Sequence, residues 1–453
     1  MDRGEVRRVT VGVGDLALAK RLYAGLLGMS VVGEWNHSEG AVRDDAQVAR
    51  FAQSLGLDEP EALSIVDLEQ PGTSVGAVRL VRVGGGEAPR INENARPYDY
   101  GYVKNLDFFT DDVRGQHARF VQAGFDFLSP PVQYAVPWGE GAVATEAHMN
   151  TRDGVKISLA QMGGVPRMAM GRSTRETPFT EVAAATHIVK DFARAESFYA
   201  DVLDLVPAAP TVIEGRLIEA LHLPEGTRLR MSFMSGLDAA GGRVGIVAYE
   251  GPGVADAQDL KNRIRAPHRG VLALTFEVRD VEHATHRALA LGANLRSSPS
   301  EARIFGASTF AATVVSPDGI PLCFEAFPES PRVQTPGRES ATPPTGVFAQ
   351  VCGLDELPPG RMFEHRPKDG SPRVALANVN GEVFAFEDRC PHLGAPLSRG
   401  EMRGRMLVCP WHGWMIDIPT GQVMGGRGRA VTPCSVRVRK GRIEVASAKK
   451  VPA

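Results

Sequence analysis

The chain has 453 residues, and 51 Lys and Arg against 53 Asp and Glu give a formal net charge of −2. This balance excludes a protein that recruits nucleic acid or an anionic membrane through its overall charge. The sequence has no run of about 18 apolar residues and no apolar signal region at its start, so we expect a cytoplasmic protein with no membrane segment. The length predicts three domains.

Four segments of the first three-quarters of the chain begin in the same way. In each, a short apolar strand is followed by an aspartate and then by apolar residues at helical spacing. An aspartate at this place predicts a helix N-cap. The four candidate N-caps are Asp15, Asp112, Asp191 and Asp280. We expect the second and fourth helices to end at Gly124 and Gly292.

Turns and strands complete each repeat. Asp153-Gly154 and Asp318-Gly319 are turn sequences, and strands of alternating polarity follow both of them. The pattern predicts four βαβββ units in the order A-B-A′-B′. The units cover approximately residues 6–84, 101–162, 181–250 and 270–327.

This repeat resembles the vicinal oxygen chelate superfamily, which includes glyoxalases, bleomycin-resistance proteins and extradiol dioxygenases. The resemblance implies an α+β fold in which tandem βαβββ units form two paired-sheet cavities. Two units normally pair to enclose one cavity. We therefore expect a first domain over residues 1–165 and a second over residues 178–328, each with two consecutive units.

The resemblance also indicates where metal ligands would lie. In the superfamily they are on the first strand of a unit, about seven residues before the helix-opening Asp, or on the last strand, about four residues after the turn Gly. In this sequence those positions hold Arg8, Asn105, Ser158, Ala184, Ala273 and Cys323. None of them is a His, Glu or Gln, so the strict register predicts no standard metal site.

A looser register resembles the extradiol dioxygenases, which hold iron with two His and one Glu from the second half of the chain. His187, His268 and Glu325 occur there in this order, which implies an open facial triad for a mononuclear Fe(II). Glu325 is two residues beyond its expected place, hence on the same strand face, whereas His187 is three residues away and His268 lies in a loop. The alternative is a satisfied, partly buried His187 and an edge or pocket carboxylate at Glu325.

Two tight loops near the C-terminus each offer one thiolate and one imidazole. Cys390-Pro391-His392 is the first and Cys409-Pro410-Trp411-His412 the second, with 16 residues between them. Two Cys on one iron and two His on the other are the ligands of a Rieske [2Fe–2S] centre. A Cys2His2 zinc site is the competing interpretation, but the C-x-H half lacks the usual finger spacing.

The region from about Val347 to Val445 resembles Rieske-type ferredoxin domains. The resemblance implies that Cys390, His392, Cys409 and His412 bind the cluster. It also implies a small all-β domain over residues 346–448, after a linker rich in Pro, Ser and Thr over residues 329–345. No nucleotide-binding loop is evident, so we expect electrons from a separate NAD(P)H-dependent reductase.

Two functions remain open at this point. In the first, the chain is an oxygenase-type oxidoreductase: the cluster passes electrons to a domain that binds a small organic substrate, with aromatic compounds among the candidates, and mononuclear iron. In the second, the repeat region is a metal-free small-molecule-binding module tethered to an electron-transfer ferredoxin. The absence of ligand residues at the expected metal positions favours the binding module. The covalent link to a redox centre favours the oxidoreductase.

Overall fold

The computed structural model describes residues 4–36, 46–57, 63–73, 75–86, 88–136, 141–164, 177–208, 210–236, 241–304, 307–326, 348–367, 372–379, 381–391, 395–410, 414–423, 430–439 and 441–446. The chain divides into two compact units, Met1–Pro328 and Glu329–Ala453. The predicted linker over residues 329–345 lies outside the described residues.

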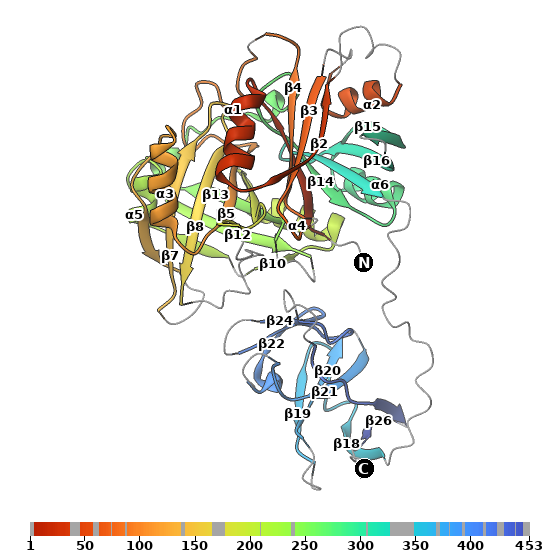
Figure 1. The fold of residues 1–453 in the computed structure, drawn as a ribbon. Helices are drawn as coiled ribbons and strands as arrows, with labels where there is room; N and C mark the ends of the chain where they lie inside the picture. Colours follow the sequence, from red (N-terminus) through yellow and green to blue (C-terminus); the bar gives the residue numbers. More distant parts are fainter. Residues whose placement is uncertain are drawn as a thin grey trace. The chain divides into compact units, whose positions relative to one another are not determined.

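Eight strands of the larger unit form one sheet in the order β15-β16-β17-β14-β1-β4-β3-β2 (Figure 1). Their bounds are β1 Val6–Gly12, β2 Ser30–Asn36, β3 Leu63–Glu69, β4 Ala77–Val83, β14 Gly270–Glu277, β15 Asn294–Ile304, β16 Ala307–Val315 and β17 Pro321–Ala326. The first and fourth repeat units meet where β1 and β14 pair antiparallel, with Thr10 opposite Ala273.

The remaining strands of this unit form a nine-stranded sheet in the order β10-β12-β13-β9-β5-β8-β7-β6, with β11 paired to β12. Their bounds are β5 Tyr102–Phe109, β6 Val132–Ala135, β7 Val143–Asn150, β8 Lys156–Gly163, β9 Ala184–Ile188, β10 Val206–Pro207, β11 Thr211–Ile213, β12 Arg228–Ser235 and β13 Arg243–Glu250. Here the second and third repeat units meet, through the antiparallel pair of β5 and β9.

The four predicted helices are present, and each begins at its predicted aspartate. They are α1 Leu16–Lys20, which continues into the π-helical turn η1 Arg21–Leu26, α3 Val113–Gln122, α4 Phe192–Leu203 and α6 Val281–Ala290. Each N-cap carboxylate accepts a hydrogen bond from the backbone N–H three residues further on, as predicted. Two further helices, α2 Ala46–Ser54 and α5 Arg216–Ala220, lie outside the repeat pattern, and short 3-10 turns cover Pro252–Val254, Lys261–Arg263 and Leu397–Arg399. None of the described helices is long and apolar enough to span a membrane.

The predicted glycine stops and turns are also confirmed. Gly124 and Gly292 follow α3 and α6 with φ of +86° and +90°, a backbone region that glycine enters without steric cost. Gly154 and Gly319 have similar φ values of +79° and +87° in the two Asp-Gly turns. β8 and β17 begin directly after these turns.

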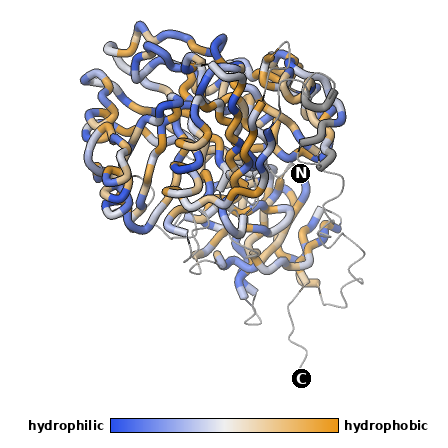
Figure 2. Tube along the Cα trace, turned by 45° about the horizontal axis from the view of Figure 1, so that its top comes forward, coloured by the Kyte–Doolittle hydropathy of each residue, from blue (hydrophilic) through white to orange (hydrophobic). Residues whose placement is uncertain are grey.

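One apolar core lies between the two sheets. In β1, Val9 and Val11 are buried in this core, whereas Arg8 and Thr10 point to the opposite face of the sheet. The core includes apolar side chains from both sheets and from α3, α4 and α6. Hydrophobic stretches accordingly follow the inner strands of this unit, while hydrophilic ones follow its outer loops (Figure 2).

The predicted pairing of consecutive repeat units needs correction. The strand order joins the first unit to the fourth and the second to the third, so neither sheet corresponds to residues 1–165 or 178–328. The edge of β1 that faces away from β4 is hydrogen-bonded by β14, and the corresponding edge of β5 by β9. The two halves of the repeat region therefore depend on each other for their central strand pairs.

The smaller unit consists of three small sheets, in agreement with the expected all-β domain. Each has three strands, in the orders β18-β26-β25, β19-β20-β21 and β22-β23-β24. Their bounds are β18 Phe348–Gly353, β19 Met362–His365, β20 Val374–Val379, β21 Glu382–Glu387, β22 Glu401–Arg403, β23 Met406–Val408, β24 Met415–Asp417, β25 Val436–Arg439 and β26 Arg442–Ala446.

Candidate functional site

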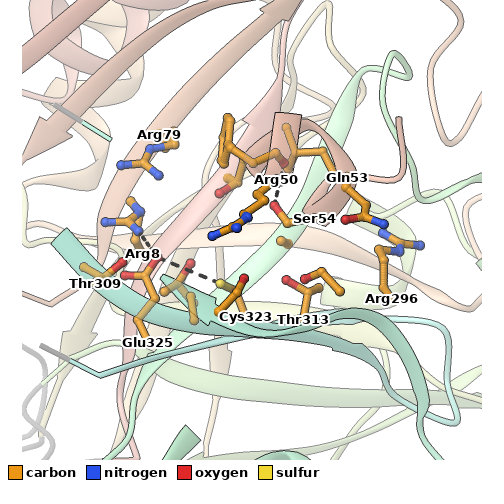
Figure 3. A pocket seen from close by; sticks show the side chains of 18 of the residues that line it. Arg8, Arg50, Gln53, Ser54, Arg79, Arg296, Thr309, Thr313, Cys323 and Glu325 are labelled. Carbon is orange, nitrogen blue, oxygen red and sulfur yellow. Dashed lines mark hydrogen bonds and ion pairs between the residues drawn. The ribbon is translucent and has the colours of Figure 1, made fainter. Parts of the chain in front are cut away.

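A cavity of about 460 Å³ lies on the face of the eight-stranded sheet that points away from the apolar core. The lining comes from strands β1, β2, β3, β4, β14, β16 and β17 and from α2 with the first half of β15. Figure 3 shows Arg50 and Ser54 of α2 on the side of the cavity that faces Thr313 and Cys323 of the strands. This volume falls within the range of small-molecule sites.

Two arginines of the cavity are paired with carboxylates of the same cavity. Arg8 Nη2 lies 2.6 Å from Glu325 Oε1, and these side chains are only 13% and 9% exposed. Arg79 donates from Nε and Nη2 to both carboxylate oxygens of Asp67, at 2.7 and 2.6 Å. Each pair neutralises its own charge, since paired ions are the form in which charge is tolerated in a largely buried site.

Two other arginines of the cavity have no carboxylate partner among the described residues. Arg50 donates from Nη1 to the carbonyl oxygen of Glu301 at 2.8 Å, and Arg296 donates from Nη2 to that of Ile264 at 3.0 Å. Nη1 of Arg296 is buried and has no hydrogen-bond partner in the described part of the chain. Burial, with the nearby charge of Arg265, lowers the pKa of Arg296.

Cys323 lies beside Glu325 on β17, with 3.9 Å between its sulfur and Glu325 Oε1. Burial, together with the negative charge of Glu325, raises the pKa of the Cys323 thiol to about 12. At neutral pH this side chain is therefore a neutral thiol, which is a poor nucleophile.

The structure does not bring together the predicted iron ligands His187, His268 and Glu325. Glu325 lines the cavity, as expected for a residue on that strand face. His187 is on β9 of the other sheet, fully buried, with its ring centroid 5.3 Å from that of Tyr199 on α4. His268 lies before β14, where its Nδ1 is 3.2 Å from the carbonyl oxygen of Arg265.

The predicted triad is therefore wrong, because β9 with His187 pairs into the nine-stranded sheet whereas Glu325 lies on β17 of the eight-stranded sheet. The odd shift of His187 turns its ring toward the helices, where burial lowers its pKa to about 3. Among the described residues, no group of three or more His, Cys, Asp and Glu could hold a metal ion.

The strict-register positions of the eight-stranded sheet do line the cavity. Arg8, Ala273 and Cys323 stand there where metal-binding relatives would carry ligands. A guanidinium cannot coordinate a metal, and alanine offers no donor atom. These three residues do not form the donor set of a mononuclear metal site.

In the nine-stranded sheet, side chains of the protein itself pack on the face away from α3 and α4. Ile188, Leu229 and Val247 of the sheet form an apolar cluster with Leu217 of α5 and Leu221 directly after it. Four tyrosines, Tyr98, Tyr100, Tyr134 and Tyr249, pack against this cluster.

A buried carboxylate lies on the same face of that sheet. Asp107 of β5 accepts a hydrogen bond from Thr186 Oγ1 at 2.8 Å. Burial, reinforced by the charge of Glu146, raises the pKa of Asp107 to about 7 despite this hydrogen bond. Asp107 therefore changes charge near neutral pH.

In the smaller unit, the two predicted cysteine ligands lie in short loops that follow strands. Cys390 comes after β21 and Cys409 directly after β23, and both are buried, with exposures of 1% and 2%. Both belong to one apolar cluster. The other two predicted ligands, His392 and His412, lie outside the described residues.

Backbone hydrogen bonds close both loops. The amide of Cys390 donates to the carbonyl oxygen of Ala395 at 2.8 Å, and the amide of Cys409 donates to that of Trp414 at 2.7 Å. Two buried thiols held in closed loops of one apolar cluster fit an iron–sulfur cluster, because a dry environment and fixed ligands are what such a group needs.

Two buried aspartates that sequence reasoning missed support these loops. Asp388 accepts hydrogen bonds from the amide and the hydroxyl of Ser398, at 2.7 and 2.9 Å. Asp417 accepts two bonds from Arg405, at 2.5 and 2.7 Å. The place of Asp388, two residues before Cys390, was the only signal available in the sequence.

Comparison with known proteins identifies two families in this chain. Residues 348–435 match the family described as Rieske [2Fe-2S] domain, and residues 182–324 match the Glyoxalase/Bleomycin resistance protein/Dioxygenase superfamily. Glyoxalase I from Zea mays, as a V278E variant, superposes with a TM-score of 0.48 at 14% identity, over 70% of this chain and 91% of that one.

Several curated relatives share only a part of the chain. Apoptosis-inducing factor 3 from Mus musculus is 32% identical over 125 residues. These residues are 27% of this chain and only 20% of that relative. The 4beta-methylsterol monooxygenase of Methylococcus capsulatus is 57% identical over 93 residues, which are 20% of this chain and 24% of that protein.

One relative is matched over almost its entire length. Ferredoxin CarAc from Metapseudomonas resinovorans is 30% identical over 111 residues, which are 23% of this chain and 97% of that protein. The match agrees with the buried cysteine loops of the smaller unit. The chain thus belongs to the Rieske [2Fe–2S] family through its C-terminal unit, and residues 182–324 of its larger unit match the glyoxalase/dioxygenase superfamily.

Proposed function

We propose that this chain is an electron-transfer protein of an oxygenase-type redox system, in which a Rieske unit is tethered to a module that binds a small organic compound. The Rieske unit would carry single electrons from a separate NAD(P)H-dependent reductase. The compound would occupy the cavity of the eight-stranded sheet.

The observation that carries the proposal is the set of side chains in that cavity. Arg8, Ala273 and Cys323 stand at the metal-ligand positions, yet the cavity has the size of a small-molecule site. A domain with this lining is suited to recognise a compound. The relatives CarAc, named a ferredoxin, and the sterol monooxygenase support a role in oxygenase systems for the attached Rieske unit.

Cys390, His392, Cys409 and His412 would hold the cluster, which supplies reversible one-electron transfer when bound. This chain's contribution is to keep both cysteine sulfurs buried and both loops closed through Ala395 and Trp414. A covalent tether would raise the effective concentration of the electron carrier near the bound compound.

An anaerobic redox titration of the full chain tests the electron-transfer part. Dithionite should change the visible spectrum with the uptake of a single electron per chain. NADH alone should leave the spectrum unchanged, and a catalytic amount of an NADH-dependent ferredoxin reductase should then produce the reduced spectrum. Rapid reduction by NADH alone, or no electron uptake from dithionite, would overturn the proposal.

A further inference from the structure

The cavity of the eight-stranded sheet has an excess of positive charge. Among the residues that the structure describes, its lining includes five arginines but only two carboxylates, Asp67 and Glu325. The five are Arg7, Arg8, Arg50, Arg79 and Arg296. Such an excess attracts negatively charged ligands and disfavours positively charged ones.

Most of this excess comes from the α2 and β15 side of the cavity. Arg8 and Arg79 are neutralised by Glu325 and Asp67, and Arg7 lies 3.5 Å from Glu277 outside the cavity. Within the described part of the chain, Arg50 and Arg296 have only backbone carbonyl partners. A carbonyl oxygen satisfies a donor but leaves the charge uncompensated.

Arg296 in particular has an unmet requirement. Its Nη1 is buried without a partner among the described residues, and a buried donor of a charged group is costly to leave unsatisfied. An anion in the cavity would meet both the hydrogen-bond and the charge requirement. A guanidinium suits this role because two of its N–H groups can bind one carboxylate.

The rest of the lining suits an organic body attached to that anion. Phe51, Leu55 and Leu295 are apolar, and they lie near the two arginines in sequence, on α2, directly after it, and on β15. Thr10, Thr275 and Thr313 add hydroxyl groups on the sheet side. Apolar walls with a few polar groups are typical of sites for small organic ligands.

We infer that the cavity binds a small organic anion, whose acidic group pairs with Arg296 while Arg50 adds positive charge to the same cavity, and whose apolar part contacts Phe51 and Leu295. This inference rests on the proposed function of the module and specifies its ligand class. It makes no use of the iron–sulfur unit, so binding and electron transfer can be tested separately.

Calorimetric titration of the full chain with naphthoate and with naphthamide tests the inference, since these two aromatic compounds differ in charge but hardly in shape. Naphthoate should bind one per chain and at least about tenfold more tightly than naphthamide. Arg296→Gln and Arg50→Gln should each weaken naphthoate binding about tenfold or more and leave naphthamide binding unchanged. Arg114→Gln, on the exposed surface of α3, is the matched control and should change neither.

Two results would overturn the inference in distinguishable ways. Equal binding of the acid and the amide would reject an anion site but leave the small-molecule module in place. Binding of neither compound would reject both. Because Arg296 is half-buried, thermal unfolding of Arg296→Gln is measured first, and the exposed Arg50 supplies the second, independent variant.

Discussion

Cys409 and Cys434 both lie next to strands of the smaller unit, but their surroundings differ. Cys409 follows β23, and Cys434 precedes β25. Cys409 is buried in a loop closed by Trp414, whereas Cys434 is half-buried in a separate apolar cluster. We expect Cys409→Ser to lose the visible spectrum, the iron and the acid-labile sulfide, because a hydroxyl replaces a thiolate ligand.

Cys434→Ser is the matched control and should keep the spectrum and the iron content. Absorption spectroscopy and iron analysis of the two variants provide the check. A fully loaded Cys409→Ser protein would show that Cys409 is not a cluster ligand.

Asp107 predicts a pH dependence of stability. Its folded pKa of about 7 is above the ordinary value, so the folded state holds a proton that the unfolded state has released. This contribution to stability is complete below about pH 4 and is lost as pH rises to about 7, with a slope of about 1.4 kcal/mol per pH unit. Asp107→Asn should remove this loss.

The measurement is the difference in unfolding free energy between wild type and Asp107→Asn from pH 5 to pH 8. The variant should gain relative to wild type as pH rises. Asp126→Asn, at an exposed position after α3, should show no such trend. A difference that stays constant with pH would contradict the raised pKa.

For single residues, the sequence predicted local features better than contacts between residues that are far apart in the chain. The N-cap aspartates were predictable because capping involves only the next three residues. The face of Glu325 was predictable from strand alternation. That Arg50 and Arg296 line one cavity was not predictable, since α2 lies outside the repeat pattern and packs against β15 only in the folded unit.

Strands β1 and β17 are linked by the ion pair of Arg8 and Glu325 across the intervening β14. Glu325→Leu should destabilise the larger unit by about 3 kcal/mol, because it leaves a largely buried guanidinium without a counter-charge. The double variant Arg8→Met/Glu325→Leu should recover most of this loss. Denaturant unfolding of the single and double variants measures the coupling, and additive losses would argue against a buried pair.

The partner of each repeat unit could not be read from the sequence. The four units share one pattern, so β1 offers the same free edge to the second unit as to the fourth. Only the completed sheets show that β14 occupies it. The unit boundaries, by contrast, were predictable. An N-cap Asp occurs in every repeat, and an Asp-Gly turn occurs in the second and the fourth.

For the whole molecule, this pairing predicts which fragments fold. Residues 1–165 would expose the edge of β1 and that of β5, together with the apolar face they share with the other half. This fragment should aggregate or remain unfolded. A fragment of residues 1–328 should instead fold and unfold in one cooperative transition. Circular dichroism and thermal unfolding compare the two, and a stable fragment 1–165 would contradict the observed sheet order.

The central claim is a Rieske unit tethered to a ligand-binding module whose described residues form no mononuclear metal site. Total metal and acid-labile sulfide per full chain, measured on anaerobically purified protein, test it most directly. The account predicts about two irons and two sulfides per chain and no further stoichiometric metal. A third equivalent of iron, or one of manganese or zinc, would contradict it, as would the absence of sulfide.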